Sequence, residues 1–390
     1  MRKVSLNEVV EINPKKSEID KSVVKDVSFV SMADVSEDGF ISNEELKSLS
    51  EVYKGYTYFK KNDVLLAKIT PCFENGKAAI ADNINCEVGF GSSEFHVLRA
   101  SDEIDPKFLF YLLWNEPLRA TLSKKMTGSA GQKRVPTDLL KKLKIPLPSL
   151  EEQKAIVAKL DRAQRLIDID KAMLAKYDQL IQSVFLEMFG DPVTNEKRWE
   201  VKKLGGFCGV GSSKRVFVKE LVEDGIPFYR GTEVGKLGEG LKIYPKLFIT
   251  KEHYEALKEH TGIPKIGDLL MPSICPDGRI FMVENESPFY FKDGRVLWVK
   301  AGESEINSFY LRYHLKALFN ANYHEIASGT TFAELKIFAL KDLGILYPPI
   351  DVQNEFQSRI EKIKEEISTT KLSLKKSQEL FSSLVQEVFG

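Results

Sequence analysis

Apolar residues recur at every seventh position in two segments of the chain. The first segment carries them at Leu160, Ile167, Leu174, Ile181 and Met188, and the second carries them at Ile360, Ile367, Leu374, Phe381 and Val388. A second row of mostly apolar positions runs beside each of these rows and is polar in its middle, at Asp170 and Thr370. This heptad pattern is typical of helices that pair along a seam.

Both segments also have the boundaries of a helix. Each begins after a proline, Pro148 or Pro348-Pro349, and each ends at a Phe-Gly pair. Proline is common at the start of a helix, and glycine is favoured just past its end. We therefore predict helices over 150–190 and 350–390, and a helix of about 37 residues within such a segment is about 55 Å long at 1.5 Å per residue.

The two segments are copies of one unit. Residues 145–190 align without a gap with residues 345–390, and twelve of the 46 aligned positions are identical. Gln153 matches Gln353 in this alignment. More faintly, the stretch around Asp63 resembles the stretch around Asp268. The duplication predicts globular domains over 1–149 and 191–349 that alternate with helices over 150–190 and 350–390.

Copies of one unit within a chain would be related by a pseudo-two-fold axis, which makes the two helices antiparallel. Asp170 and Thr370 would then meet near the middle of the seam. The paired helices would hold the two globular domains at a fixed separation. Two alternatives remain open: each helix packs on its own domain, or the seam drives homodimerisation.

Each globular domain mixes short strand-like runs with helices. Residues 27–35 and 226–234 resemble corresponding strands, and residues 106–114 and 307–315 resemble corresponding buried helices. The predicted fold class is therefore α+β. Two similar globular domains are separated by two long antiparallel helices that form a coiled coil, in an internal repeat with pseudo-two-fold symmetry.

The charge of the chain is balanced, with 56 Lys and Arg against 56 Asp and Glu. This balance argues against a protein that coats DNA through phosphates alone, so a nucleic-acid role must rest on local patches. Residues 124–144 hold seven Lys or Arg and one acid, and residues 202–215 hold four basic residues and no acid. Both stretches contain small residues, which let backbone amides approach phosphates, while Gln, Lys and Arg can reach base edges.

These patches supply the candidate DNA-binding residues. For any one of them, a solvated surface charge is the competing interpretation. We expect alanine at Lys133 and Arg134 to weaken DNA binding and to lower its salt dependence. The candidates are Lys68, Lys77, Ser92, Lys125, Gln132, Lys133, Arg134, Lys214, Arg215, Arg230, Arg279, Arg295, Thr330 and Thr331.

No motif of a catalytic or cofactor site is recognisable. The five histidines lack metal-ligand spacing, and the four cysteines are scattered without a CxxC pair. The stretch from Gly231 resembles a phosphate-binding loop but has only three residues between its glycines. We expect no metal and no cofactor. The longest apolar run, 108–114, is too short to cross a bilayer, and no signal peptide is recognisable, so we expect a cytoplasmic protein.

The residues that enter the two helices carry a family resemblance. The stretch IPLPSLEEQ from Ile145, repeated as YPPIDVQ from Tyr347, resembles the repeated regions of specificity subunits of type I restriction–modification systems, and so does MFGDP from Met188. The resemblance covers essentially the whole chain. It implies two target-recognition domains, each reading one half of a bipartite site in double-stranded DNA, and helices that set the spacer.

The same resemblance implies partners. Two modification subunits would dock on the helices and carry S-adenosylmethionine, and restriction subunits would join through the complex and carry ATP hydrolysis and cleavage. This chain would then be no enzyme. The leading hypothesis is a bipartite DNA reader; a coiled-coil scaffold whose domains bind proteins is the alternative, and sequence-specific DNA binding discriminates the two.

Overall fold

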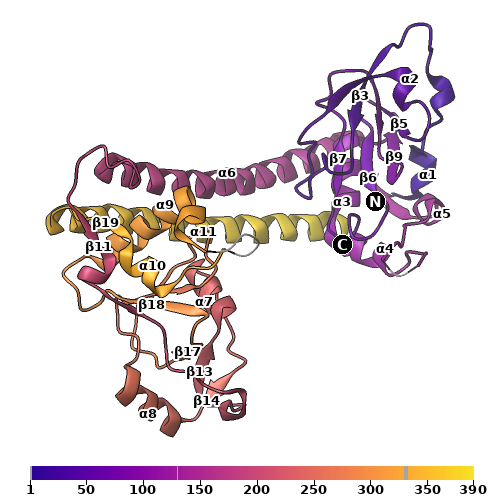
Figure 1. Ribbon diagram of the computed structural model, residues 1–390. Helices are drawn as coiled ribbons and strands as arrows, with labels where there is room; N and C mark the ends of the chain where they lie inside the picture. Colours follow the sequence, from indigo (N-terminus) through magenta and orange to yellow (C-terminus); the bar gives the residue numbers. More distant parts are fainter. Residues whose placement is uncertain (1, 130, 329–332) are drawn as a thin grey trace. The chain divides into compact units, whose positions relative to one another are not determined.

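The computed structural model describes residues 2–129, 131–328 and 333–390, and it divides into two compact units (Figure 1). Unit 1 contains residues 1–172 and 371–390, and unit 2 contains residues 173–370. The long helices α6 (Leu150–Phe189) and α11 (Ile350–Phe389) have 40 residues each. Each of them contributes one part to unit 1 and the other part to unit 2.

Unit 1 contains two four-stranded sheets. The first has the strand order β2-β9-β6-β7 and is antiparallel throughout. The second has the order β4-β3-β8-β5, and its β3 and β8 are parallel. The bounds are β1 Arg2–Ser5, α1 Leu6–Val9, β2 Val10–Ile12, η1 Lys16–Glu18, β3 Asp26–Val30, β4 Glu45–Ser48, α2 Leu49–Val52, β5 Thr57–Lys60, β6 Val64–Ala67, β7 Ala78–Ile80, β8 Val88–Gly91, β9 Phe95–Ala100, α3 Pro106–Trp114, α4 Glu116–Ser123, α5 Thr137–Lys141 and β10 Lys144–Leu147.

Unit 2 repeats this plan. Its larger sheet has the order β12-β18-β15-β16, and in its smaller sheet, β14-β13-β17, strands β13 and β17 are parallel. The larger sheets match strand for strand, and within the described residues the smaller sheet of unit 2 matches that of unit 1 except that it lacks a counterpart of β5. The correspondence extends the duplication beyond the long helices. The bounds are β11 Val201–Lys203, η2 Leu204–Gly206, β12 Gly209–Gly211, η3 Val218–Glu220, β13 Ile226–Tyr229, α7 Gly231–Gly238, β14 Phe248–Ile249, α8 Lys251–Thr261, β15 Leu269–Pro272, β16 Phe281–Met282, β17 Tyr290–Phe291, β18 Val296–Lys300, α9 Ser308–Ile326, α10 Ile337–Asp342 and β19 Gly344–Leu346.

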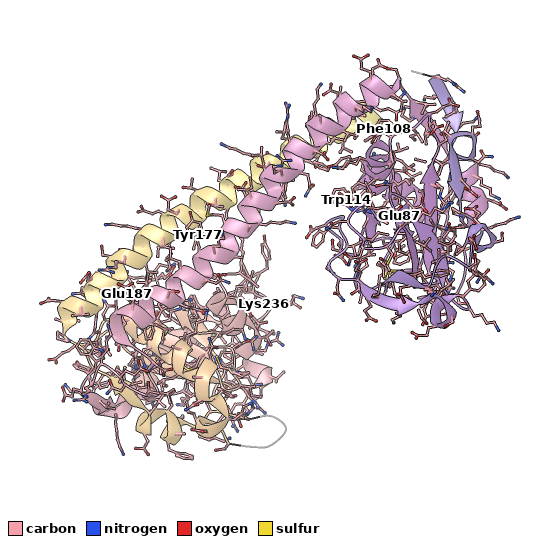
Figure 2. All side chains as sticks on the ribbon, turned by 90° about the horizontal axis from the view of Figure 1, so that it is seen from above. Glu87, Phe108, Trp114, Tyr177, Glu187 and Lys236 are labelled. Atoms are coloured by element: carbon pink, nitrogen blue, oxygen red, sulfur yellow. The ribbon has the colours of Figure 1, made fainter. Side chains whose placement is uncertain are left out.

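A buried helix follows the last strand of each larger sheet. In unit 1 this helix is α3, whose six residues from Phe108 to Leu113 are all buried. Figure 2 labels Phe108 and Trp114 near its two ends. The Asp105 carboxylate caps it by accepting hydrogen bonds from two backbone N–H groups of the first turn. In unit 2 the Asn307 side chain caps α9 in the same way. The sequence predicted both helices as buried.

One buried glutamine in each unit joins this cap to the start of the long helix. The Gln153 Oε1 accepts from the Asp105 backbone N–H at 2.7 Å, and its Nε2 donates to the carbonyls of Glu103 and Pro148 at 3.0 and 2.9 Å. In unit 2, Gln353 accepts from the Asn307 N–H at 2.9 Å and donates to the Pro348 carbonyl at 2.8 Å. The proline and the glutamine that repeat in the sequence therefore belong to one hydrogen-bonded joint.

The long helices run antiparallel within each unit, because unit 1 combines the beginning of α6 with the end of α11. In unit 1, Leu160 and Val385 belong to the same core as α3, and the Phe389 ring lies 5.3 Å from that of Phe108. In unit 2, Phe189 of α6 lies 4.5 Å from the Tyr310 ring and 5.3 Å from the Phe356 ring of α11. The helices thus pack on the globular domains as well as on each other.

The ten seam residues of the heptad rows are all buried or half-buried. Several further apolar residues, including Phe185, Phe189 and Val385, lie outside those rows and are buried against the domains. The polar layer differs from the expectation: Asp170 accepts a hydrogen bond from Ser377 at 3.4 Å rather than facing the equivalent Thr370. The reason is register, since an antiparallel pair seldom brings equivalent positions together. The predicted fold class is confirmed.

The structure also bears on a membrane location. Within the described ranges, no helix combines the length and the apolar character that crossing a bilayer requires.

We predict that replacing Gln153 with leucine lowers the free energy of unfolding by about 1–3 kcal/mol, because the Asp105 N–H and two carbonyls lose their partner in a buried place. Urea denaturation measures the change. The exposed Gln179 on the same helix provides the control, and its replacement with leucine should change the unfolding free energy by less than about 0.5 kcal/mol. Equal losses in both variants would contradict the joint.

Candidate nucleic-acid interface

The candidate residues of unit 1 gather at one edge, where strands β3, β6 and β8 end. Lys68 follows β6, and its backbone N–H donates to the Glu94 carbonyl at 2.9 Å. The Ser92 N–H donates to the Val30 carbonyl at 3.3 Å. The Lys77 ammonium donates to the Met32 carbonyl at 3.0 Å, just beyond the end of β3. Residues that are far apart in the sequence thus form one continuous edge.

A hairpin loop closes over this edge. We call residues 127–134 the unit 1 loop. Its ends, Thr127 and Arg134, exchange backbone hydrogen bonds of 3.0 and 2.8 Å. Gly128 has a φ of +127°, and a Cβ there would lie 2.7 Å from the Gln132 carbonyl oxygen, so the turn requires glycine. The Thr70 N–H donates to the Lys133 carbonyl at 2.9 Å, which ties the loop to the chain just beyond β6.

The candidate side chains on this edge differ in their exposure and in whether they are already bound to another group of the chain. Lys125, Gln132 and Lys133 are exposed, whereas the Lys68 ammonium donates to the Ser93 carbonyl at 2.6 Å. The Arg134 guanidinium makes a bidentate pair with the Glu94 carboxylate, at 2.9 and 2.8 Å. Hydrogen bonds from Arg134 hold the pKa of the Glu94 carboxyl below its usual value. The charge of Arg134 is therefore already matched within the chain.

The equivalent edge of unit 2 is built by the same backbone contacts. The Ser273 N–H donates to the Arg295 carbonyl at 3.0 Å, and the Leu335 N–H donates to the Ser273 carbonyl at 2.7 Å. Ser328 and Glu334 exchange hydrogen bonds of 3.0 and 2.9 Å, as the ends of the unit 1 loop do. We call residues 328–334 the unit 2 loop. The candidates Thr330 and Thr331 belong to it and lie outside the described residues.

Each candidate arginine of unit 2 has a carboxylate partner. Arg215 donates to Asp293 at 3.0 Å, and Arg279 donates to Asp277 at 2.8 Å. Arg295 lies 3.3 Å from Glu334. Arg230 binds Glu233 in the first turn of α7. The strand predicted over 226–234 ends at Tyr229, and the glycine-rich stretch from Gly231 to Gly238 is a helix. Lys214 is held through its backbone N–H, which donates to the Tyr290 hydroxyl at 3.0 Å.

Glycines bring α7 against the candidates Arg279 and Arg295. A Cβ on Gly231 would lie 3.2 Å from the Arg295 carbonyl oxygen, and one on Gly235 would lie 3.3 Å from the Arg279 guanidinium. The structure therefore places Arg230, Arg279 and Arg295 around one short helix. The acidic partners of the arginines were missed by the sequence reasoning, because a lone carboxylate outside a motif gives no signal of its partner.

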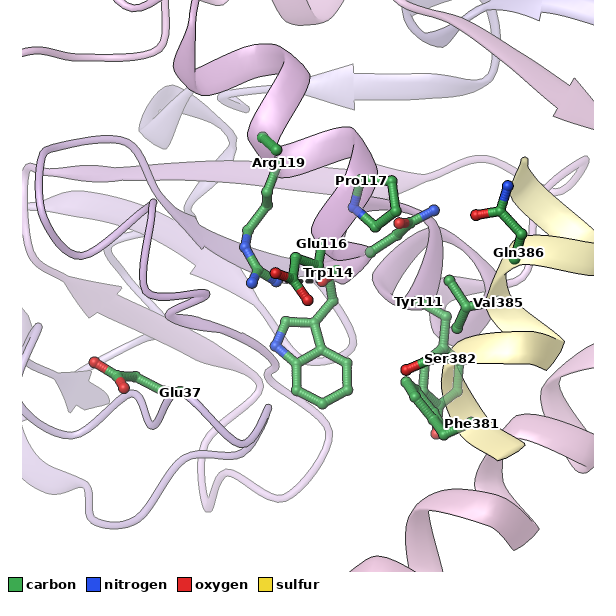
Figure 3. Close-up of a pocket in the computed structure, with 12 residues that line it drawn as sticks. Glu37, Tyr111, Trp114, Glu116, Pro117, Arg119, Phe381, Ser382, Val385 and Gln386 are labelled. Carbon is green, nitrogen blue, oxygen red and sulfur yellow. Dashed lines mark hydrogen bonds between the residues drawn. The ribbon is translucent and has the colours of Figure 1, made fainter. Parts of the chain in front are cut away.

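A groove lies elsewhere on unit 1, where α3 and α4 meet the end of α11. Figure 3 shows Trp114, Glu116 and Arg119 on one side and Phe381 and Val385 of α11 on the other. Unit 2 has an equivalent groove, lined by Ile181 and Phe185 of α6 and by Tyr313 of α9. Both grooves lie beside the long helices, at equivalent places in the two units, and none of the described candidate DNA-binding residues lines either of them.

Each unit also buries one histidine. The His96 ring is hydrogen-bonded to the Val135 carbonyl at 2.8 Å, and the His314 Nε2 accepts from the Leu346 N–H at 3.1 Å. Burial lowers the pKa of both rings, and it lowers that of His314 to about 3. Both histidines therefore stay neutral at physiological pH, which fits structural roles. Within the described residues, no cluster of three or more His, Cys, Asp or Glu side chains could hold a metal ion.

Comparison with known proteins places this fold in a family. A family model described as a type I restriction modification DNA specificity domain matches residues 1–176 and again residues 196–377. This chain belongs to that family. Its two matches cover most of both units and confirm that the chain carries the domain twice.

Named relatives agree with the family. The type I restriction enzyme EcoAI specificity subunit of Escherichia coli is 38% identical over 186 residues, which is 46% of this chain and 31% of that protein. The MjaIX specificity subunit of Methanocaldococcus jannaschii is 26% identical over 361 residues, 85% of this chain and 78% of that protein. The matches to EcoAI and to the EcoEI subunit of Escherichia coli span only about a third of those proteins.

Solved structures share the fold. One from a study of the structural basis of complex assembly and conformational transition of the type I R-M system superimposes with a TM-score of 0.65 at 19% identity, and the match covers 99% of this chain and 97% of that one. The type I restriction–modification S subunit from M. genitalium superimposes with a TM-score of 0.55 at 16% identity, over 100% and 96% of the two chains. At such identities the likeness shows the fold alone.

We predict that Lys133→Ala weakens DNA binding to all sequences alike and lowers the slope of log affinity against log salt by about one, as expected for one lost phosphate contact. Binding titrations over a range of salt concentrations measure both effects. Lys159, exposed on α6, is the matched control, and its alanine variant should keep the full slope. An unchanged slope for Lys133→Ala would remove this residue from the interface.

We also predict an acid-sensitive stability in unit 2. Because the folded pKa of His314 is about 3 and the unfolded value is near 6.5, the unfolded chain binds a proton that the native state excludes. The contribution of the neutral, buried His314 ring to the free energy of unfolding is complete above pH 6.5 and is lost as the pH falls toward 3. The wild type should lose about 1.4 kcal/mol between pH 7.5 and 5.5 through this group.

Urea denaturation at the two pH values tests this prediction. His314→Gln, which keeps an acceptor for the Leu346 N–H, should lose less stability on acidification than the wild type does. His260→Gln, at an exposed position, should behave like the wild type. If His314→Gln and the wild type lose the same stability, the buried ring is not the source of the pH dependence.

Proposed function

We propose that this chain is the sequence-specific DNA-binding subunit of a type I restriction–modification complex, and that each unit reads one half of a bipartite site in double-stranded DNA. The observation that carries this proposal is the duplicated edge. In both units the described ends of a loop join each other by backbone hydrogen bonds, and the chain that follows binds the end of the equivalent strand. Basic side chains lie at both edges, and Gln132 adds an amide at the edge of unit 1. The family to which the chain belongs is described as a DNA specificity domain of type I restriction modification, and this description supports the proposal.

The exposed side chains of the edge have the chemistry that DNA recognition needs. Gln132 can offer a donor and an acceptor to a base edge, while Lys125 and Lys133 can neutralise phosphates. In unit 2, the exposed Lys214 offers the corresponding positive charge. Because the net charge of the chain is zero, specific contacts must supply a larger share of the affinity than a general electrostatic attraction does.

The long helices would set the spacer between the two half-sites. Each helix has 40 residues, which corresponds to about 60 Å at 1.5 Å per residue. Each contributes packing residues to both globular cores, so a change in helix length must change the connection between the units. This makes the helix pair a ruler for the unread base pairs.

The partners follow from the same proposal. Two modification subunits would dock on the chain and transfer the methyl group, and restriction subunits would join through the complex. This chain would contribute recognition and no catalysis, and it would need no cofactor of its own. Such a complex would act on DNA in the cytoplasm.

A coiled-coil scaffold that binds only proteins is the second candidate function. The arginines of unit 2 favour it, because each of the four candidates is already matched by a carboxylate. Selection from random duplexes by the chain in complex with its modification partner separates the two functions. A reader enriches a sequence made of two defined halves and a constant spacer, whereas a scaffold enriches none.

We predict that inserting one heptad after Ala172 and another after Thr370 lengthens the spacer by up to about three base pairs, since seven residues add about 10 Å to a helix and keep the phase of the seam. Mapping of the methylated sites measures the spacer. A heptad inserted in α6 alone is the control, and it should disrupt helix pairing and binding. An unchanged spacer in the double insertion would refute the ruler.

A further inference from the structure

One ion pair occurs in both units with its charges exchanged. In unit 1 the Lys68 backbone N–H donates to the Glu94 carbonyl, and the Val135 N–H donates to the Lys68 carbonyl. In unit 2 the Ser273 N–H donates to the Arg295 carbonyl, and the Leu335 N–H donates to the Ser273 carbonyl. This correspondence makes Glu94 equivalent to Arg295, and Arg134 equivalent to Glu334. The sheet side of the pair is thus acidic in unit 1 and basic in unit 2.

The pair joins the loop to the sheet edge in each unit. In unit 1 the Arg134 guanidinium spans two partners: it binds both oxygens of Glu94, and its Nη1 donates to the Gln132 carbonyl at 3.1 Å. In unit 2, Glu334 receives Arg295 at 3.3 Å and the Lys336 ammonium at 2.6 Å. The guanidinium of Arg134 therefore fixes the backbone of the residue that we propose to reach a base edge.

The exposure of the pair is intermediate. The Arg134 side chain is 42% exposed and that of Glu94 is 27% exposed. An exposed ion pair contributes little to global stability, so its persistence at one structural position with either polarity points away from a folding role. A bidentate geometry supplies direction instead, because the planar guanidinium holds the carboxylate in one orientation.

We propose that Glu94–Arg134 in unit 1 is a clasp that positions residues 131–134 for reading DNA, and that Arg295–Glu334 is the equivalent clasp between the described residues of unit 2. Arg134 is then a positioning residue and not a phosphate contact. This inference rests on the proposed function. The opposite polarity also matches each loop to its own edge, because the carboxylate of Glu334 would meet a like charge at the position of Glu94.

Charge exchange in unit 1 tests the clasp. The variants are Arg134→Glu, Arg134→Lys and the double variant Glu94→Arg/Arg134→Glu, each in complex with the modification partner. In the first, two carboxylates repel each other, and discrimination at the half-site read by unit 1 should fall at least tenfold. The half-site read by unit 2 should be unaffected. The double variant restores an ion pair and should recover discrimination to within about twofold of the wild type.

Arg134→Lys separates geometry from charge. Lysine keeps the charge but cannot hold the carboxylate and the Gln132 carbonyl at once, so discrimination should fall while the salt slope stays at the wild-type value. Lys107→Glu is the matched control, because Lys107 forms a 3.0 Å pair of similar exposure with Asp161 elsewhere in unit 1. This control should leave both half-sites unchanged.

Two outcomes overturn the clasp. If the double variant discriminates as poorly as Arg134→Glu, Arg134 contacts DNA directly. If Arg134→Glu discriminates like the wild type, the pair does not position the loop.

Hydrogen exchange of the free chain tests the clasp without DNA. The Thr127 and Arg134 amides, which bond to each other's carbonyls, should exchange at least fivefold faster in Arg134→Glu and at the wild-type rate in the double variant. Unchanged exchange in Arg134→Glu overturns the clasp by itself. A wild-type complex that enriches no sequence while the exchange behaves as expected overturns the proposed function and leaves the clasp supported as a loop anchor.

Discussion

The architecture of each unit depends on one buried amide. Gln153 and Gln353 sit where a long helix begins, and each of them binds the backbone N–H of the residue that caps the buried domain helix. A buried amide that lost these partners would be costly, so the start of the long helix is fixed against the domain in position and direction. The preceding proline supplies a carbonyl for the same amide, which explains why proline and glutamine repeat together.

From this joint the packing of the cores follows. Once the start of a long helix is fixed, its apolar face lies over the domain, and the antiparallel partner completes the cover. Phe189 and Phe356 close the core of unit 2 in this way, and Leu160 and Val385 close that of unit 1. Each core therefore contains residues from opposite ends of the duplicated segments. A chain with only one of the two helices would leave both cores partly open to water.

The two edges that carry the loops lie at the ends of the strands and are built by backbone contacts that do not depend on side-chain identity. The same pattern of hydrogen bonds therefore accepts Lys68 in one unit and Ser273 in the other, and Glu94 in one and Arg295 in the other. A conserved frame with exchangeable side chains is what two readers of different half-sites need. The charge-exchanged pair is the clearest sign that the frame is shared while its surface chemistry is not.

The heptad rows, the duplication, the long helices and the buried character of residues 106–114 can all be predicted from the amino-acid sequence, because these are periodic or local patterns of apolar residues. The sequence also located the unit 1 loop through Gly128 and its basic neighbours. Which charges are matched becomes clear only in the folded chain: Arg134 meets Glu94 across 40 residues, and Arg295 meets Glu334 across 39. The same holds for the contact of Asp170 with Ser377. Such pairings follow from how strands and helices are brought together in space, and no local pattern in the chain records them.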